Sequence, residues 1–145
     1  MIVGFMLPIA ACSGLEVVEK RYATYAEAKR KKQYWDWIPE WLPVSAHDIV
    51  DIHNNDSLWQ TLTFKLSPSD VPAMIGSLRP VERPRSEAAL KFAAGVGWAV
   101  PPQSTPEVYY VCSPDKGVLI VDRAGGRAFY RRSGEWATKR CGPRA

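Results

Sequence analysis

Alternation of hydrophobic and polar positions is clearest between residues 58 and 66, where every second residue is Leu, Gln or Phe. This period of two predicts a β-strand, and the polar run Asn54-Asn55-Asp56-Ser57 before it has the composition of a turn. Residues 46–53 also fit one face of a helix. Because the downstream strand needs a partner, the pattern favours a β-hairpin over 49–66 instead.

The C-terminal third predicts an antiparallel meander over 107–132. Stretches rich in Val, Ile and aromatic residues alternate there with two turns, one carrying Pro114 and Gly117 and the other the pair Gly125-Gly126. Adjacent glycines accept the positive φ values of a tight hairpin. The three strands are expected at Glu107–Cys112, Val118–Asp122 and Arg127–Arg132.

Short helices are predicted between the strands. Thr24 and Glu27 have the spacing of a capping box, so we expect a strand over 15–22 and then a helix over 25–32. Ser45 is expected to cap a single helical turn, Ser69-Asp70 to begin a helix over 71–78, and a further helix is expected over 86–94. The elements together predict an α+β fold, with an antiparallel sheet of about five strands packed on one face by two or three short helices.

The first eleven residues contain no charged side chain and are followed directly by Cys12. This apolar run is too short to cross a bilayer as a helix, which needs roughly 20 residues, but it suits the core of a signal peptide. Ile9-Ala10-Ala11-Cys12 resembles the bacterial lipobox, in which the Cys thiol accepts diacylglycerol. An ordinary Cys after a buried first strand is the alternative.

The expected organisation is therefore a lipoprotein signal peptide at 1–11, a lipid anchor and tether at 12–16, and one α+β domain at 17–145. This places the protein in the bacterial cell envelope, facing the periplasm and held to the membrane by the lipid on Cys12. Ser13 after the anchor favours the outer membrane in a Gram-negative host.

Composition agrees with one globular domain. The 145 residues are 46% hydrophobic and carry a formal net charge of +4. The Lys and Arg residues are spread over several short groups, which is typical of a solvated surface and does not indicate a nucleic-acid site. We expect a monomer that binds no nucleic acid.

The sequence contains no H-E-x-x-H motif, no Gly-rich phosphate loop, no C-x-x-C pair and no G-x-S-x-G elbow, and no cofactor is expected. The two histidines, His47 and His53, lie near Asp51, and on one face of a strand these three residues could bind a divalent metal. The simpler interpretation is a structural turn, in which Asn54 and Asp56 build the hairpin and His53 donates a hydrogen bond that fixes it. We favour that interpretation and a protein that is not an enzyme.

Trp35, Trp37 and Trp41 lie within seven positions of a segment interrupted by prolines. Trp side chains anchor protein interfaces and also stack on sugars, so this segment is the candidate binding surface. The alternative is that the three indoles cover one edge of the sheet.

Several motifs together resemble a group of bacterial lipoproteins related to the YbbD head domain. They are Tyr22-Ala-Thr-Tyr-Ala-Glu-Ala28, Trp37-Ile-Pro-Glu-Trp-Leu-Pro43, Ser45-Ala46, Ile49, His53-Asn54-x-Asp56, Tyr109-Tyr110-x-Cys112, Val121-Asp122-Arg123 and Gly126-x-Ala128-Phe129-Tyr130. The resemblance implies the lipid anchor and the fold, and it implies little about activity.

We therefore expect a non-catalytic envelope lipoprotein that binds another envelope protein, in envelope maintenance or as an immunity-like neutraliser of a toxin. A peptidoglycan or glycan binder that uses the tryptophans is the alternative. If Cys12 carries lipid, Cys112 and Cys141 are the remaining thiols in an oxidising compartment, and we expect them to form a disulfide. A buried Cys112 thiol with Cys141 free is the other possibility.

Overall fold

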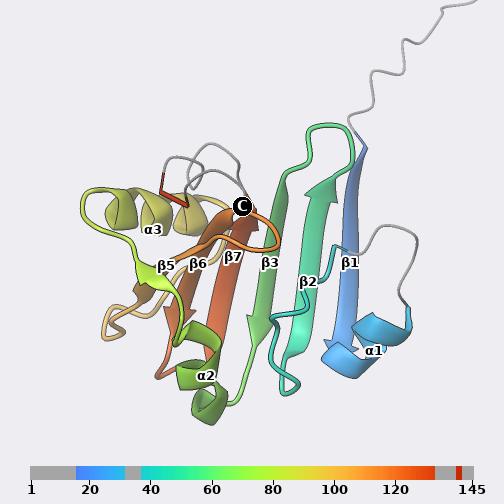
Figure 1. The fold of residues 1–145 in the computed structure, drawn as a ribbon, viewed down its shortest axis with the longest axis horizontal. Helices are drawn as coiled ribbons and strands as arrows, with labels where there is room; N and C mark the ends of the chain where they lie inside the picture. Colours follow the sequence, from blue (N-terminus) through green and yellow to red (C-terminus); the bar gives the residue numbers. More distant parts are fainter. Residues whose placement is uncertain (1–15, 32–36, 133–139, 142–145) are drawn as a thin grey trace, which may run out of the picture.

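The computed structural model describes residues 16–31, 37–132 and 140–141. Within these residues one antiparallel sheet has seven strands in the order β1-β2-β3-β7-β6-β5-β4 (Figure 1). The strands are β1 (Val17–Thr24), β2 (His47–Asn54), β3 (Gln60–Lys65), β4 (Arg79–Pro80), β5 (Glu107–Val111), β6 (Gly117–Asp122) and β7 (Arg127–Arg132). The helices are α1 (Tyr25–Arg30), α2 (Val71–Ile75) and α3 (Arg85–Gly95), with a 3₁₀ turn at Pro68–Asp70 before α2.

The α+β class, the hairpin and the meander are confirmed, but the sheet is wider than the predicted five strands. Six of the seven strands correspond to segments that the sequence patterns predicted individually, including the strand over 15–22. The seventh is β4, whose two residues pair with Tyr109 and Tyr110 of β5. Two residues cannot establish an alternating period, and one of them is Pro80, which is rare inside strands.

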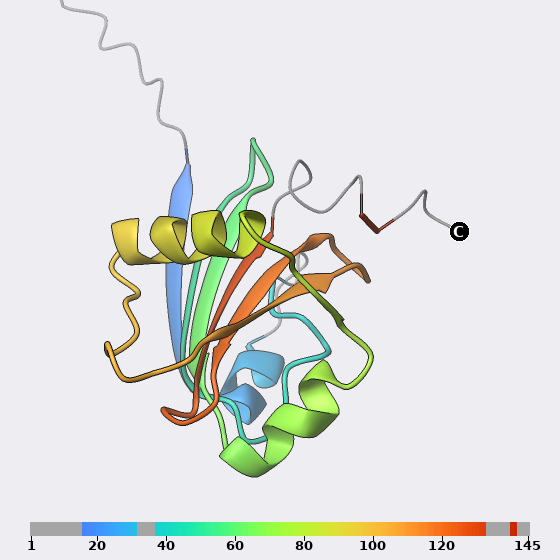
Figure 2. The same ribbon diagram turned by 90° about the vertical axis from the view of Figure 1, so that its left-hand side faces the viewer.

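The prediction that helices cover one face of the sheet is wrong. Figure 2 shows α3 against one face, and α1 and α2 on the other. The reason lies in β6, because all six of its residues are buried. Its apolar side chains alternate between two separate cores, one on each face of the sheet. One core contains Leu119 and Val121, and the other contains Val118 and Ile120. Strands that are apolar on both faces need cover on both faces.

Local signals account for the helix ends unequally. The capping box is present, because Glu27 N donates to Thr24 Oγ1 over 3.1 Å and Ala23 N donates to Glu27 Oε2 over 2.7 Å. Asp70 was expected to cap the helix over 71–78, but its side chain makes no cap hydrogen bond. It accepts a hydrogen bond from Ser45 Oγ instead, and α2 ends at Ile75. In the described part of the chain, no helix has the length and apolar character to cross a membrane.

Candidate functional site

A buried polar group links β2 to β3 on the face of the sheet that carries α1 and α2. Asp51 and His53 are two residues apart on β2, so their side chains share a face, and Gln60 of β3 is the register partner of His53. His53 Nδ1 lies 2.8 Å from Asp51 Oδ2, and Gln60 Nε2 donates to Asp51 Oδ1 over 2.7 Å. Both oxygens of the carboxylate are therefore engaged.

Trp37 covers this buried polar group and contacts two of its residues, His53 and Gln60. Its ring stacks on the imidazole of His53, with centroids 4.3 Å apart and planes 12° from parallel. Its backbone carbonyl accepts a hydrogen bond from Gln60 Nε2 over 2.6 Å, and the Arg132 guanidinium lies 5.0 Å from the ring centroid. We call Trp37, Asp51, His53, Gln60 and Arg132 the Trp37 network.

Burial sets the electrostatics of the Trp37 network. Asp51 is 1% exposed and His53 is 2% exposed. Burial raises the pKa of the Asp51 carboxyl, and the hydrogen bond from Gln60 and the nearby His53 oppose that shift. Every buried polar side-chain atom among the described residues has a hydrogen-bond partner. The network therefore fixes the segment after residue 36 to the sheet without leaving a buried group unpaired.

His53 does not hold the turn, contrary to the sequence prediction. Asn54 does so: its Oδ1 accepts hydrogen bonds from Asp56 N over 3.0 Å, Ser57 N over 2.7 Å and Ser57 Oγ over 2.7 Å. Asp56 takes part through its backbone only. The imidazole of His53 lies on the same sheet face as the Asp51 carboxylate, because the two residues are two positions apart on β2.

The metal-ligand set of His47, Asp51 and His53 is not assembled. His47 is exposed, and its Nδ1 lies 2.9 Å from the carbonyl oxygen of Ser45. A register shift in the β2–β3 ladder separates it from the other two residues. Across residues 16–31, 37–132 and 140–141, no three His, Cys, Asp or Glu side chains come together in a way that could hold a metal ion.

Trp41 lies farther along the same face and contributes to a different feature. Its ring makes an edge contact with Tyr130 at 5.1 Å and a tilted contact with Phe64 at 6.3 Å. The rest of its surface lines a hollow of about 310 Å³, which lies between residues 41–44 and residues 70–74. The residues around this hollow, which we call the Trp41 groove, are Trp41, Pro43, Val44, Asp70, Ala73 and Met74.

Two interactions hold the walls of the Trp41 groove together. Ser45 Oγ donates to Asp70 Oδ2, and Ser67 N donates to Ser45 Oγ over 3.1 Å. Val44 is 86% exposed at the rim, which makes it the most exposed large hydrophobic residue of the described part. The groove therefore combines a fixed shape with an apolar lining.

The predicted tryptophan surface is thus divided. Trp37 belongs to the buried network and Trp41 to the groove, while Trp35 lies outside the described residues. Sequence reasoning missed Val44, Ala73 and Met74, because they come from two segments about 30 positions apart that no period connects. The isolated Val44 between Pro43 and Ser45 was the available signal.

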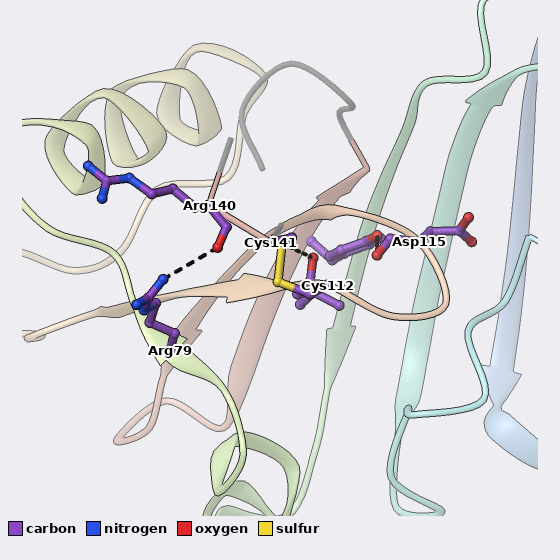
Figure 3. The surroundings of a disulfide bond; sticks show 7 residues. Arg79, Cys112, Asp115, Arg140 and Cys141 are labelled. Atoms are coloured by element: carbon purple, nitrogen blue, oxygen red, sulfur yellow. Dashed lines mark hydrogen bonds between the residues drawn. A yellow bond between two sulfur atoms is a disulfide. The ribbon is translucent and has the colours of Figure 1, made fainter. Parts of the chain in front are cut away.

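A disulfide joins Cys112, just after β5, to Cys141, with an S–S distance of 2.03 Å and a Cα separation of 5.3 Å. Figure 3 shows the neighbouring hydrogen bond from Arg79 Nη1 to the Arg140 carbonyl oxygen, over 3.3 Å. Arg140 Nη2 also lies 2.7 Å from Glu82 Oε1. These contacts attach residues 140–141 beside β4. Cys12, the predicted lipidation site, lies outside the described residues.

Comparison with known proteins found one family. Residues 16–65 match the family model of the YbbD head domain, which supports a YbbD head-like family for this part of the chain. The match covers β1, α1, β2 and β3, and so includes the Asp51, His53 and Gln60 side chains of the Trp37 network. No curated protein and no solved structure matches the chain.

Proposed function

We propose that the protein is a lipid-anchored lipoprotein of the bacterial envelope, whose domain binds another envelope protein at the Trp41 groove without catalysing a reaction. The observation that carries the binding proposal is an open apolar groove with Val44 86% exposed at its rim. Exposed apolar patches on otherwise polar surfaces mark interaction sites, and Trp is enriched among the residues that dominate binding energy.

The contacts of Trp41 support this role. The edge contact with Tyr130 and the tilted contact with Phe64 fix the indole against the core. A partner that inserts an apolar side chain would therefore meet a surface whose side-chain entropy is already lost. Such preorganisation raises affinity, because little further ordering is required on binding.

The Trp37 network supports a structural role for the second tryptophan. The His53 imidazole is buried and stacked against the indole, so we assign it no catalytic step. A sugar would need an open indole face, and His53 and Arg132 already contact the Trp37 ring. For this reason we prefer a protein ligand to a glycan.

The groove can be tested by placing a photo-crosslinking amino acid at Val44, with Val96 as the matched control position. Val96 is also an exposed valine, at 54%, but it lies at the end of α3 on the other face of the sheet. We expect an envelope protein to crosslink at position 44 and not at position 96. Free V96D protein should compete for this crosslink, and V44D should compete at least about tenfold less well, as expected for a hot-spot side chain.

Equal crosslinking at the two positions would argue against the groove. A protein that sediments with isolated cell walls, and loses this property in Trp41→Ala, would favour the glycan alternative instead.

The anchor has its own test. Globomycin, which inhibits lipoprotein signal peptidase, should cause the precursor to accumulate, and Cys12→Ala should release the protein from the membrane fraction or leave it unprocessed. Unchanged processing and membrane attachment in both experiments would refute the lipoprotein proposal.

A further inference from the structure

The loop between β2 and β3, residues 55–59, forms an ordered tip at one end of the molecule (Figure 1). Asn54 organises it, because its side-chain oxygen accepts from Asp56 N and from Ser57 N and Oγ. Its backbone contributes too: Leu58 N donates to Asn54 O over 3.0 Å, and Asn54 N donates to Trp59 O over 3.1 Å. The tip therefore holds its side chains in defined positions.

Leu58 is unusual at this place. It has a φ of 55°, in the left-handed region, and its side chain is 58% exposed. A branched apolar residue in that conformation is disfavoured, and Gly or Asn would adopt it with less strain. Neither packing nor turn geometry explains why a leucine occupies the tip.

The tip lies beside the start of the folded domain. In the β1–β2 ladder Val17 is the register partner of Asn54, so the chain enters the sheet next to the tip. Val17 is itself 54% exposed, and Trp59 is half-buried. Val17, Leu58 and Trp59 are therefore the apolar residues at this end of the domain, beside the exposed polar residues Asn55, Asp56 and Ser57, and we call these three apolar residues the tip patch.

The length of chain before Val17 determines what this patch can reach. Five residue steps separate Cys12 from Val17, and an extended chain covers at most about 3.6 Å per residue, or roughly 18 Å in all. If Cys12 carries lipid, the tip patch must therefore lie within that distance of the bilayer surface. Trp and Leu side chains are favoured at the headgroup level of a membrane.

We propose that the tip patch contacts the bilayer and that Leu58 and Trp59 rest among the lipid headgroups, so that the strands stand on the membrane by their β2–β3 end. This inference rests on the lipid anchor of the proposed function. It also orients the Trp41 groove, because Trp41 contacts Phe64, four residues along β3 from Gln60. At about 3.3 Å per residue the groove lies roughly 13 Å farther from the membrane, where a partner has access to it.

The test uses single fluorescent labels on the complete lipidated protein in phosphatidylcholine vesicles. The described cysteines are joined as a disulfide and Cys12 is the proposed lipid site, so Leu58→Cys and Val44→Cys each supply one thiol for an environment-sensitive dye. We expect the dye at position 58 to shift to the blue on reconstitution and to lose quenching by aqueous iodide. The dye at position 44 should keep the spectrum and the quenching that it has in detergent-free buffer.

A dye at position 58 that remains as quenchable as the dye at position 44, on protein whose lipidated Cys12 is verified by mass spectrometry, would overturn the proposal. A second arm separates this failure from failure of the anchor. There the mature chain from Ser13 onward carries a hexahistidine tag in place of the lipid and binds vesicles that contain a nickel-chelating lipid. Immersion of position 58 in that arm supports a membrane-contacting tip even if Cys12 carries no lipid, and equal quenching at both positions refutes it.

Discussion

The imidazole of His53 lies flat against the indole of Trp37, with the ring centroids 4.3 Å apart. The two residues are 16 positions apart in the sequence, and this contact attaches the segment that follows α1 to β2, the second strand from one edge of the sheet. The same segment continues to Trp41 and Val44, so the position of the groove depends on it. Stability and the proposed binding surface are therefore linked through one aromatic pair.

Removing the Trp37 ring should destabilise the domain. Trp37→Ala uncovers His53 and Asp51, and we expect the free energy of unfolding to fall by about 2–4 kcal/mol, somewhat below the cost for a fully buried Trp. Trp37→Phe keeps an aromatic face over the imidazole and should cost less than half as much. Urea denaturation measures the free energy of unfolding of both variants. Equal losses would show that an aromatic face over the imidazole does not by itself stabilise the domain.

Asp51 should make the domain more stable on mild acidification. Burial raises the pKa of the Asp51 carboxyl above its ordinary 3.8. At a pH between 3.8 and the raised pKa of the folded state, the folded protein therefore keeps a proton that the unfolded chain has lost. The free energy of unfolding therefore falls as the pH rises through this window and is regained as the pH falls. In urea denaturation from neutral pH to about pH 4, wild-type protein should gain stability relative to Asp51→Asn.

Asp48 on the same strand provides a control with the opposite sign. A hydrogen bond from Lys65 lowers the pKa of the exposed Asp48 carboxyl. Its contribution is present above pH 3.8 and is lost as the pH falls through the lowered value. Acidification below pH 3.8 should therefore reduce the difference between wild-type protein and Asp48→Asn, whereas this difference should stay unchanged from neutral pH to about pH 4. The same trend in both variants would contradict the assignment for Asp51.

The disulfide should account for much of the stability of the C-terminal segment. Cys112 and Cys141 are 29 positions apart, and closing such a loop contributes about 3.6 kcal/mol in the chain-entropy model. We expect reduction, or Cys112→Ala with Cys141→Ala, to lower the free energy of unfolding by an amount of this order. Two alkylatable thiols in unreduced, denatured mature protein would show that the pair does not form.

Leu58→Asn should stabilise the isolated domain. Asn tolerates the left-handed conformation at φ 55° better than Leu does, and the leucine side chain gives up little packing because it is 58% exposed. We expect a gain of up to about 1 kcal/mol in the free energy of unfolding. Thermal unfolding of the detergent-free domain measures it. A loss of stability would mean that Leu58 packs within the folded protein, and would weaken the case for a role at the membrane.

Most strands could be predicted because their patterns are local. The meander was placed to within one residue at the ends of its strands, since turn residues and Val-rich runs mark both limits. The capping box of α1 was equally local. By contrast, β4 depends on pairing with Tyr109 and Tyr110, and its own two residues carry no signal.

The site was less predictable, because long-range contacts build it. His53 was interpreted through its neighbours Asn54 and Asp56, yet its partners are Asp51, Gln60 and Trp37. Gln60 occupied an apolar position of the strand pattern, and a buried Gln at such a place signals a hydrogen-bond network. The groove lining joins segments that meet only in the folded chain.

The order of the strands gives the YbbD head-like segment a further property. The matched residues end at Lys65, the last residue of β3, and the outer edge of β3 pairs with Arg127–Arg132 of β7. Leu62 and Phe64 are buried in a core shared with Ala128 and Tyr130. The matched segment thus forms three strands of the sheet, and the border strand β3 is completed by β7, which lies outside the match. In this chain the bordering strand comes from residues 127–132, so removal of residues 66–145 would leave one edge of β3 without its hydrogen-bond partners.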